Sequence, residues 1–324
     1  MKRIIGVLAI ALLLGSAGVA EPGKVDFPKK GQPITMIIPW AAGASSDLGG
    51  RLLAMGMEKE LGVPVLVVNK PGASGQIGMT EVAKAKPDGY TIAYCALSSA
   101  VLPYMDASRK ATFQRKELMG VASHVGDVRA VAVSAKSRYK TLKDLAEAIK
   151  ANPGKIKAGT NGAMTDCHFA QLLFAKLSGG EFSYVHFKGG GETIPALMGG
   201  HVDTYFGSSS ELTRFVKSGE FRVLAILGEK ESKFLPGVKT AKAQGYPVFF
   251  TTDRDIYVPG GTPKEVIDIL AKSIKKVMES EEHRKKMEGE LNLPLEFQGP
   301  VEVEKAWDEM EDNLKKLIPL ARKN

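Results

Sequence analysis

Two segments of the chain each place an apolar strand, a loop of small residues and a helix in immediate succession. In the first, strand 34–38 is stopped by Pro39, and the loop leads into a helix that begins near Ser46 or Asp47. The second segment, residues 156–174, has the same order. Such a junction leaves free backbone N–H groups at the positive end of a helix dipole, where an anion is stabilised. Two facing loops of this kind predict a binding site for a small organic acid.

The remaining sequence continues to alternate strands and helices, which is typical of α/β proteins with parallel sheets. In the helix expected at 47–61, the spacing of Leu48, Leu52 and Met55 predicts that these side chains face the core. A later helix should follow Thr262 as its N-cap, with Pro263 at its first position. Further helices are expected at 76–85, 142–151, 193–198 and 301–318, and strands at 65–68, 90–95, 130–134, 155–158, 184–187, 201–206 and 222–227.

A mature chain of about 300 residues is longer than one hydrophobic core usually organises, so we expect two lobes. Strand 130–134 should leave the first lobe, and a long strand at 248–258 should carry the chain back. The first lobe then comprises residues 21–128 and 256–324, and the second comprises residues 129–255. Two crossover strands between lobes permit hinge closure around a ligand.

The first twenty residues have the composition of a cleaved secretory signal. Lys2 and Arg3 precede an apolar run at 4–14, and small residues 18–20 stand before Glu21. The apolar run is short for a membrane span, so an uncleaved anchor is the less favoured alternative. No cysteine lies at the cleavage site, which disfavours a lipoprotein. We therefore expect an exported protein, periplasmic if its source is a Gram-negative bacterium.

Composition excludes several other classes of protein. Loss of Lys2 and Arg3 leaves 42 basic against 36 acidic residues, and the lysines are spread along helices, which does not favour nucleic-acid binding. The five histidines lack metal-ligand spacing, so neither a metal nor another cofactor is expected. Cys95 and Cys167 could form a disulfide, but two separate buried thiols are favoured, since one ends a strand and the other opens a helix.

Seven short blocks stand in order along nearly the whole mature chain: IIPWAAGASSD, VVNKPGASGQIG, AKPDGYTI, GTNGAMTDCH, FKGGGETIPALMGGHVD, VKTAKAQGYP and VPGGTPKEV. Together they resemble the Bug, or TctC-type, solute-binding proteins of tripartite tricarboxylate transporters. The resemblance implies a two-lobed periplasmic-binding-protein fold of type II character, which delivers a carboxylated solute to membrane permease subunits without catalysis. It also implies that the ligand is held mainly by backbone N–H groups, small hydroxyls and water. We expect a monomer.

The first loop supplies most of the candidate ligand contacts. Small residues let the backbone approach a carboxylate, and the serine hydroxyl adds a donor. A carboxylate at Asp47 would repel the ligand, so this residue should cap the helix or fix a water molecule. The alternative is an ordinary capped loop without a ligand. The family usually has glycines where Ala44 and Ser45 stand. The candidates in this loop are Trp40, Ala42, Gly43, Ala44, Ser45 and Asp47.

In the second loop, Asn161, Gly162 and Thr165 offer the same chemistry. His168 falls in the first turn of the following helix, where the helix dipole disfavours a protonated ring, so a structural or water-holding role is favoured over a proton carrier. Ser98 follows the strand at 90–95, and Gly207 and Ser208 follow the strand at 201–206. Ligands of open sheets lie beyond the carboxyl ends of strands, although turn chemistry explains these small residues equally well.

Arg254 stands between Asp253 and Asp255 in the returning crossover, where the family pattern differs. One interpretation is a hinge ion pair that sets the angle between the lobes. The other is a bidentate contact to a second ligand carboxylate. Two other functions remain open, namely a ligand sensor that signals to a membrane kinase and, less favoured, an exported hydrolase of small acids. A hydrolase would need a nucleophile paired with a base, and no such motif is found in the sequence.

Overall fold

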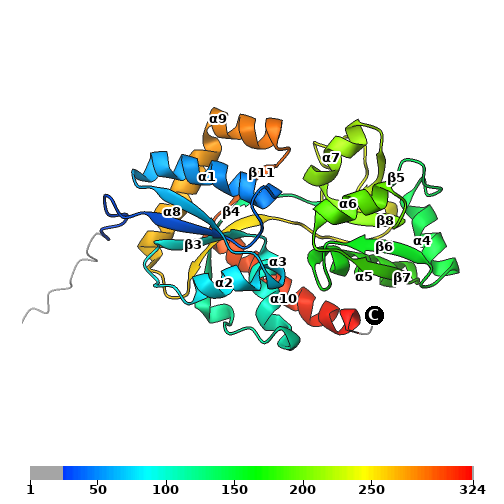
Figure 1. Cartoon of the computed structure of the whole chain (residues 1–324), viewed down its shortest axis with the longest axis horizontal. Helices are drawn as coiled ribbons and strands as arrows, with labels where there is room; N and C mark the ends of the chain where they lie inside the picture. The colour runs from blue at the N-terminus through cyan, green and yellow to red at the C-terminus, as the bar shows by residue number, and fades with distance from the viewer. Residues whose placement is uncertain (1–24, 323–324) are drawn as a thin grey trace, which may run out of the picture.

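The computed structural model describes residues 25–322, so the predicted signal peptide at 1–20 lies outside the described residues. Within this range the chain forms two lobes, each built on one sheet (Figure 1). Across the first sheet the strands are β11 (Leu295–Gln298), β4 (Leu118–Val125), β10 (Arg254–Pro259), β3 (Thr91–Cys95), β1 (Ile34–Ile38) and β2 (Val65–Asn69). Across the second they are β7 (Phe182–His186), β6 (Ile156–Thr160), β8 (Thr204–Ser208), β5 (Arg129–Ser134) and β9 (Phe221–Ile226).

The first sheet is apolar on both faces because helices cover both. Strand β1 is parallel to β2 and β3, whereas β10 is antiparallel to β3 and β4. Ile34, Met36 and Ile38 belong to one core cluster, and Ile37 between them belongs to another, as the alternation of side chains in a strand requires. The helices of this lobe are α1 (Ser45–Leu61), α2 (Gln76–Ala83), α3 (Leu97–Met105), α8 (Lys264–Glu279), α9 (Glu281–Arg284) and α10 (Pro300–Ala321).

The second lobe contains α4 (Leu142–Ala151), α5 (Asp166–Ser178), α6 (Gly190–Met198) and α7 (Ser209–Lys217). Helix α4 has the predicted bounds, and Thr141 is its N-cap. Thr141 Oγ1 accepts a hydrogen bond from Asp144 N, and the Asp144 carboxylate accepts one from Thr141 N. This reciprocal capping box fixes the first turn of the helix.

Helix α1 turns a different face to the core than the sequence predicted. Leu48 and Met55 are 42% and 55% exposed, and Leu52 is only partly buried. The buried face instead contains Gly50, where an added Cβ would lie 2.5 Å from Ile38 Cδ1. Leu53, Ala54 and Met57 complete this buried face. The helix therefore packs on the sheet through a second apolar stripe that includes a glycine, and apolar spacing alone did not decide between the two stripes.

The two lobes are joined by two connections, as predicted, but the returning strand is shorter. Strand β10 begins at Arg254, and the expected strand at 248–258 is replaced before that point by irregular chain. Only one bridge, between Val128 and Thr251, pairs the two connections. Strands β5 to β9 lie between residues 129 and 226, while Arg254 already belongs to the first sheet. The exact lobe borders stay a prediction.

Several other elements differ from the sequence-based expectation. The strand expected at 201–206 is β8 at Thr204–Ser208, so Gly207 and Ser208 are buried strand residues and do not follow the strand. Lys264 begins α8, and Thr262 is not its cap, since its hydroxyl donates to the Pro259 carbonyl. Strands β4 and β11 and helices α3 and α7 were not predicted. Gly, Ser or His residues interrupt the apolar patterns of β4, α3 and α7, and β11 is only four residues long, with polar residues between its apolar ones. Both cysteines are free and buried, which confirms the favoured alternative.

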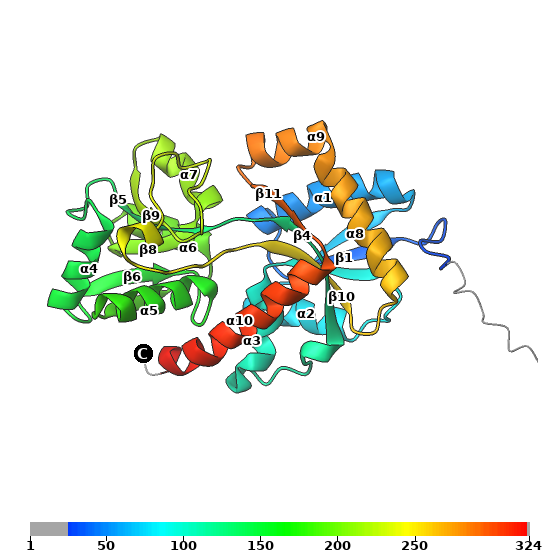
Figure 2. The ribbon, with the colours of Figure 1, turned by 180° about the vertical axis from the view of Figure 1, so that it is seen from behind.

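Helix α10 of the first lobe also packs against the second lobe. It packs against β4 and α3 in the first lobe, and its C-terminal part contacts α5 of the second (Figure 2). Leu314, Leu317 and Ile318 near its end are buried. A relative movement of the lobes therefore has to move α5 against the end of α10.

Candidate functional site

The starts of three helices lie next to the hinge. Helix α1 follows β1, α5 follows β6 and α7 follows β8, each at the carboxyl end of its strand. Arg254 is the first residue of β10 and Arg129 is the first residue of β5, so each arginine marks the end of one connection. These two side chains tie the helix starts to the hinge.

In the first loop, Asp47 binds the loop internally. Ala44 occupies the N-cap position without a side-chain cap, and the Asp47 carboxylate accepts hydrogen bonds from Gly43 N at 2.8 Å, Arg51 Nε at 3.0 Å and Asn69 Nδ2 at 2.9 Å. Burial alone would raise the pKa of this carboxyl, but the three hydrogen bonds lower it below its ordinary value. Asp47 therefore stabilises the first loop as an anion from the third position of α1, not as its N-cap, and the Gly43 N–H is already engaged.

The same loop offers an approach from solvent. Ala42, Gly43 and Ala44 are exposed, and Trp40 and Ser45 are half-buried. The Gly43 backbone has a φ of +80°, which a residue with a Cβ adopts only with strain. The chain thus brings bare backbone to the surface directly before the positive end of α1. That these residues contact a ligand stays a prediction.

In the second loop, Thr165 is the N-cap of α5 and accepts a hydrogen bond from His168 N. Its hydroxyl lies 3.1 Å from Asn161 Oδ1 and 2.9 Å from the Gly162 carbonyl oxygen. Met164 N donates to Nδ1 of His168 at 3.1 Å. The loop is therefore held in shape by its own polar groups.

His168 is a neutral ring in this structure. Because Nδ1 accepts from Met164, the ring proton lies on Nε2, which is buried and has no hydrogen-bond partner. Burial and the neighbouring His186 lower the pKa of His168 to about 4. The ring lies edge-on to Tyr184, with centroids 4.6 Å apart. His168 is thus an uncharged donor at neutral pH, and its role toward a ligand stays a prediction.

Arg129 and Asp166 form a buried ion pair that sequence reasoning missed. Nη2 and Nε of Arg129 lie 2.7 and 3.1 Å from the same Asp166 oxygen, and Nη1 donates to the Phe206 carbonyl at 2.9 Å. Burial opposes the guanidinium charge, but the Asp166 carboxylate raises the pKa of Arg129. Asp166 is the first residue of α5, so this pair fixes the second loop to the hinge. Arg129 stands in an apolar strand and carries no motif.

Arg254 is 4% exposed and does not pair with its sequence neighbours. Nη2 donates to Ser45 Oγ at 2.9 Å, Nε donates to Ser46 Oγ at 3.3 Å, and Nη1 donates to the Thr252 carbonyl at 3.0 Å. Nη1 also lies 3.6 Å from Asp127 Oδ2. The sequence anticipated a hinge ion pair as one alternative, but the acid is Asp127 of the other connection.

Asp127 continues this network into the second lobe. Its carboxylate is fully buried and accepts hydrogen bonds from Ser209 Oγ at 2.8 Å and from Ser210 Oγ at 2.5 Å. Its backbone carbonyl accepts from Thr252 N at 2.8 Å. A continuous chain of polar contacts therefore runs from the start of α1, through Arg254 and Asp127, to the start of α7.

The other predicted site residues have different surroundings. Ser98 lies in the first turn of α3 and is half-buried. Ser208 is 3% exposed and lies 3.4 Å from the Ser210 hydroxyl, which links it to Asp127. Gly207 is buried, and an added Cβ would lie 2.5 Å from the Tyr205 ring. Gly207 and Ser208 thus support the hinge from inside β8.

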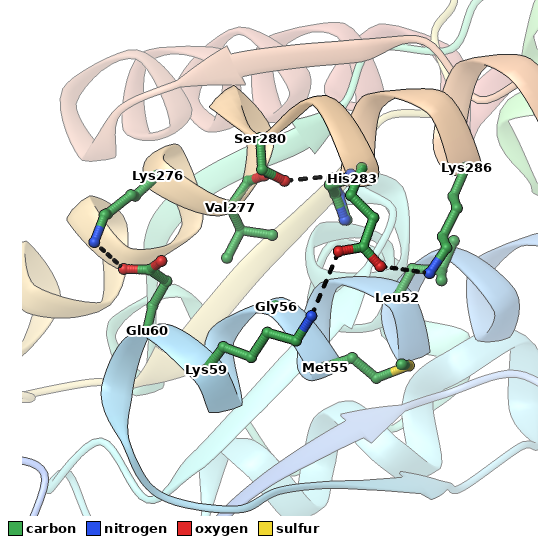
Figure 3. Close-up of a pocket in the computed structure, with 11 residues that line it drawn as sticks. Leu52, Met55, Gly56, Lys59, Glu60, Lys276, Val277, Ser280, His283 and Lys286 are labelled. Atoms are coloured by element: carbon green, nitrogen blue, oxygen red, sulfur yellow. Dashed lines mark hydrogen bonds and ion pairs between the residues drawn. The ribbon is translucent and has the colours of Figure 1, made fainter.

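A separate pocket lies on the first lobe, between α1 and the α8–α9 corner (Figure 3). Its lysines are already paired with acids, since Lys59 and Lys286 approach Glu282 at 3.5 and 2.8 Å, and Lys276 approaches Glu60 at 2.5 Å. Between residues 25 and 322 no group of histidine, cysteine and acidic side chains is arranged to hold a metal ion. Nor does this range contain a helix that is long and apolar enough to cross a membrane.

A buried polar chain begins at this pocket and runs into the first lobe. The two Nε2 atoms of His283 and His124 are 2.8 Å apart, and Nδ1 of His124 lies 2.9 Å from the Tyr94 hydroxyl. Burial lowers the pKa of His283 to about 4 and holds that of His124 well below its usual range. Their separation of 159 residues explains why the sequence did not indicate the pair.

We expect this pair to make the protein sensitive to acid. An unfolded histidine has a pKa of about 6.5. Between pH 6.5 and 4, His283 is therefore protonated in the unfolded chain but neutral in the folded protein. Stability from this residue is present above pH 6.5 and is lost as the pH falls. His283→Gln should reduce the slope of unfolding free energy against pH by up to about 1.4 kcal/mol per pH unit. Urea unfolding at pH 7, 6 and 5 measures it, and parallel curves for the two proteins would contradict it.

Two lobes, two connections and helix starts gathered at the hinge define the class of two-lobed solute receptors. The match to the family model places the chain more narrowly. Residues 50–293 match TctC, the tripartite tricarboxylate transporter family receptor, and the chain belongs to this family. Its members are solute-binding receptors and not enzymes.

The relatives extend over most of the chain. A Cupriavidus necator protein described as "UPF0065 protein in gbd 5'region" is 34% identical over 284 residues, which is 87% of this chain and 85% of the relative. Protein BugT of Bordetella pertussis is 31% identical over 283 residues, 86% of each chain. The solved TctC solute-binding protein from Polaromonas is 26% identical with a TM-score of 0.76, covering 92% of this chain and all of that one.

Solved structures that are more distant share the same fold. Two proteins from Rhodopseudomonas palustris, each 21% identical, have TM-scores of 0.78 and 0.76 and cover 91% of this chain. They span 98% and 100% of their own chains, and one contains adipate and the other malate. At this identity the likeness concerns the fold alone.

Proposed function

We propose that this protein captures a small carboxylic acid between its lobes and delivers it to the membrane subunits of a tripartite tricarboxylate-type transporter. The observation that carries the proposal is the start of α1. There exposed backbone at 42–44 meets the hydroxyls of Ser45 and Ser46 and the guanidinium of Arg254. The helix dipole and the hydroxyl donors both favour an anion at this point, and the Arg254 guanidinium, whose charge Asp127 compensates, holds the two hydroxyls.

The acids of the chain limit where the ligand carboxylate binds. Asp47 at α1, Asp127 at α7 and Asp166 at α5 each stand at a helix start and accept hydrogen bonds there. A ligand anion placed against these carboxylates would be repelled. We infer that it binds on the outer side of the first loop, against Ser45 and the exposed backbone. The polar groups of the second loop, Asn161, Gly162 and Thr165, would close over it.

Closure about the hinge would bury the ligand and present a joint surface of both lobes to the permease. The residues proposed to contact the ligand remain those of the two loops and Ser98, with Arg254 and Ser208 behind them. We propose a periplasmic monomer released from its signal peptide. A sensor of organic acids would use the same site, and loss of uptake on deletion of this receptor would separate the two functions.

A thermal-unfolding screen of residues 21–324 against small organic acids tests the binding step. An acid at 100 times its dissociation constant should stabilise the fold by about 2.7 kcal/mol. Ala44→Phe should abolish that shift, because the new ring covers the loop. Ala151→Phe is the matched control, since both alanines are exposed and only Ala44 lies at the hinge. Stabilisation by sugars or amines but by no acid would contradict the proposal.

A further inference from the structure

The hydrogen-bond direction at Ser45 and Ser46 is fixed by the chemistry of their partner. A guanidinium only donates, so the two hydroxyl oxygens must accept from Arg254. Each hydroxyl then keeps its own hydrogen, which points away from the guanidinium. Both serines are half-buried and occupy the first two positions of α1, beside the exposed backbone of the loop. The arginine thus converts two freely rotating hydroxyls into oriented donors.

Arg254 itself is held on every side. Its three nitrogens contact the Ser45 hydroxyl, the Ser46 hydroxyl and the Thr252 carbonyl, with Asp127 beside the last. With 4% of its surface exposed, the Arg254 side chain is closed off from solvent, whereas both serines are half-buried. The Asp127 carboxylate compensates the buried charge, and its bonds to Ser209 and Ser210 anchor it in the second lobe.

We propose that Arg254 is a positioning residue that orients the hydroxyls of Ser45 and Ser46 as donors to the ligand carboxylate, without touching the ligand. This inference rests on the proposed function and assigns Arg254 a role in addition to its ion pair with Asp127 at the hinge. The Arg254 guanidinium also polarises the hydroxyls of Ser45 and Ser46, which strengthens the hydrogen bonds that they donate. Because Asp127 contacts both Arg254 and the serines at the start of α7, the position of the two hydroxyl donors depends on the second lobe.

A double-mutant cycle separates this role from direct contact. Calorimetry would measure the affinities for adipate and for hexanoate, acids of equal length with two and one carboxylates. Ser45→Ala/Ser46→Ala and Arg254→Met should each weaken binding by tenfold or more, since a hydrogen bond to a charged group is lost. The variant that combines all three changes should bind no more weakly than the serine variant, and both acids should lose the same factor.

Several outcomes would overturn the inference. Losses that multiply in the combined variant, or a loss for adipate much greater than for hexanoate, would mean that Arg254 contacts the ligand. Wild-type affinity in Ser45→Ala/Ser46→Ala would mean that these hydroxyls do not bind the ligand. This result can be read even if Arg254→Met does not fold. Wild-type protein that binds neither acid would also overturn it, while the proposed function survives if other acids stabilise the fold. Arg322→Met, which breaks an ion pair with Asp106 away from the hinge, should leave the affinity unchanged.

Discussion

Arg129→Met should lower the free energy of unfolding by about 3–5 kcal/mol, because it leaves the Asp166 carboxylate buried without its counter-charge. The Phe206 carbonyl also loses a donor. Desolvation makes an unpaired buried charge far more costly than the loss of a surface pair. Denaturation by urea, followed by circular dichroism, measures the change.

Two further variants show whether the buried pair is the cause. Arg129→Met/Asp166→Leu removes both charges and should recover a large part of the loss, since apolar side chains can replace a buried pair. Lys143→Met breaks an ion pair with Glu147 whose side chains are 76% and 66% exposed, and should cost at most about 1 kcal/mol. A loss in Arg129→Met no greater than in Lys143→Met would contradict the assignment.

Trp307→Ala should cost a similar amount, about 3–5 kcal/mol. Trp307 is fully buried in the N-terminal half of α10 and donates to the Tyr104 hydroxyl at 2.7 Å. Its ring stands edge-on to Tyr257, with centroids 5.1 Å apart, and the Arg115 guanidinium lies 4.1 Å from its centre. Alanine would leave a cavity between the helix and the sheet. Calorimetric unfolding gives the change in midpoint and enthalpy.

The same helix offers a control for this substitution. Val301 is 78% exposed, so Val301→Ala should change the stability by no more than about 0.5 kcal/mol. Trp307→Phe keeps an aromatic ring but loses the hydrogen bond to Tyr104, and should fall between the two. Equal stability of the Trp307→Ala and Val301→Ala proteins would mean that α10 is not anchored through this side chain.

Local sequence signals accounted for a large part of the fold. The bounds of α4 could be predicted locally because the reciprocal cap of Thr141 and Asp144 is complete within four residues. The face of α1 was wrong because the helix carries two apolar stripes, and the buried one, with Leu53 and Met57, is the one in which Gly50 lets the helix approach the sheet. The length of β10 was wrong because the chain before Arg254 makes a single bridge, between Thr251 and Val128, and no continuous ladder, although residues 248–250 are apolar.

At the candidate site, the sequence indicated the two loops but not what holds them. Arg129 and Asp166 are 37 residues apart, and Asp127 and Ser210 are 83 apart. No motif joins such pairs, since only the folded sheets bring their strands together. Arg254 could be singled out from its place in the returning crossover. Its ion-pair partner, Asp127, could not, because that residue lies in the other connection.

The place of β10 in the first sheet decides the order in which the lobes can be completed. It lies between β3 and β4, and both pair with it, yet it is made more than a hundred residues after them. During synthesis the edges of β3 and β4 that face β10 therefore stay unpaired until residue 259 has followed, and the other edge of β4 stays unpaired until β11 has followed. All strands of the second sheet lie between residues 129 and 226, so that lobe can fold first. The first sheet, whose strands begin the chain, is therefore completed only by strands made after the whole second sheet.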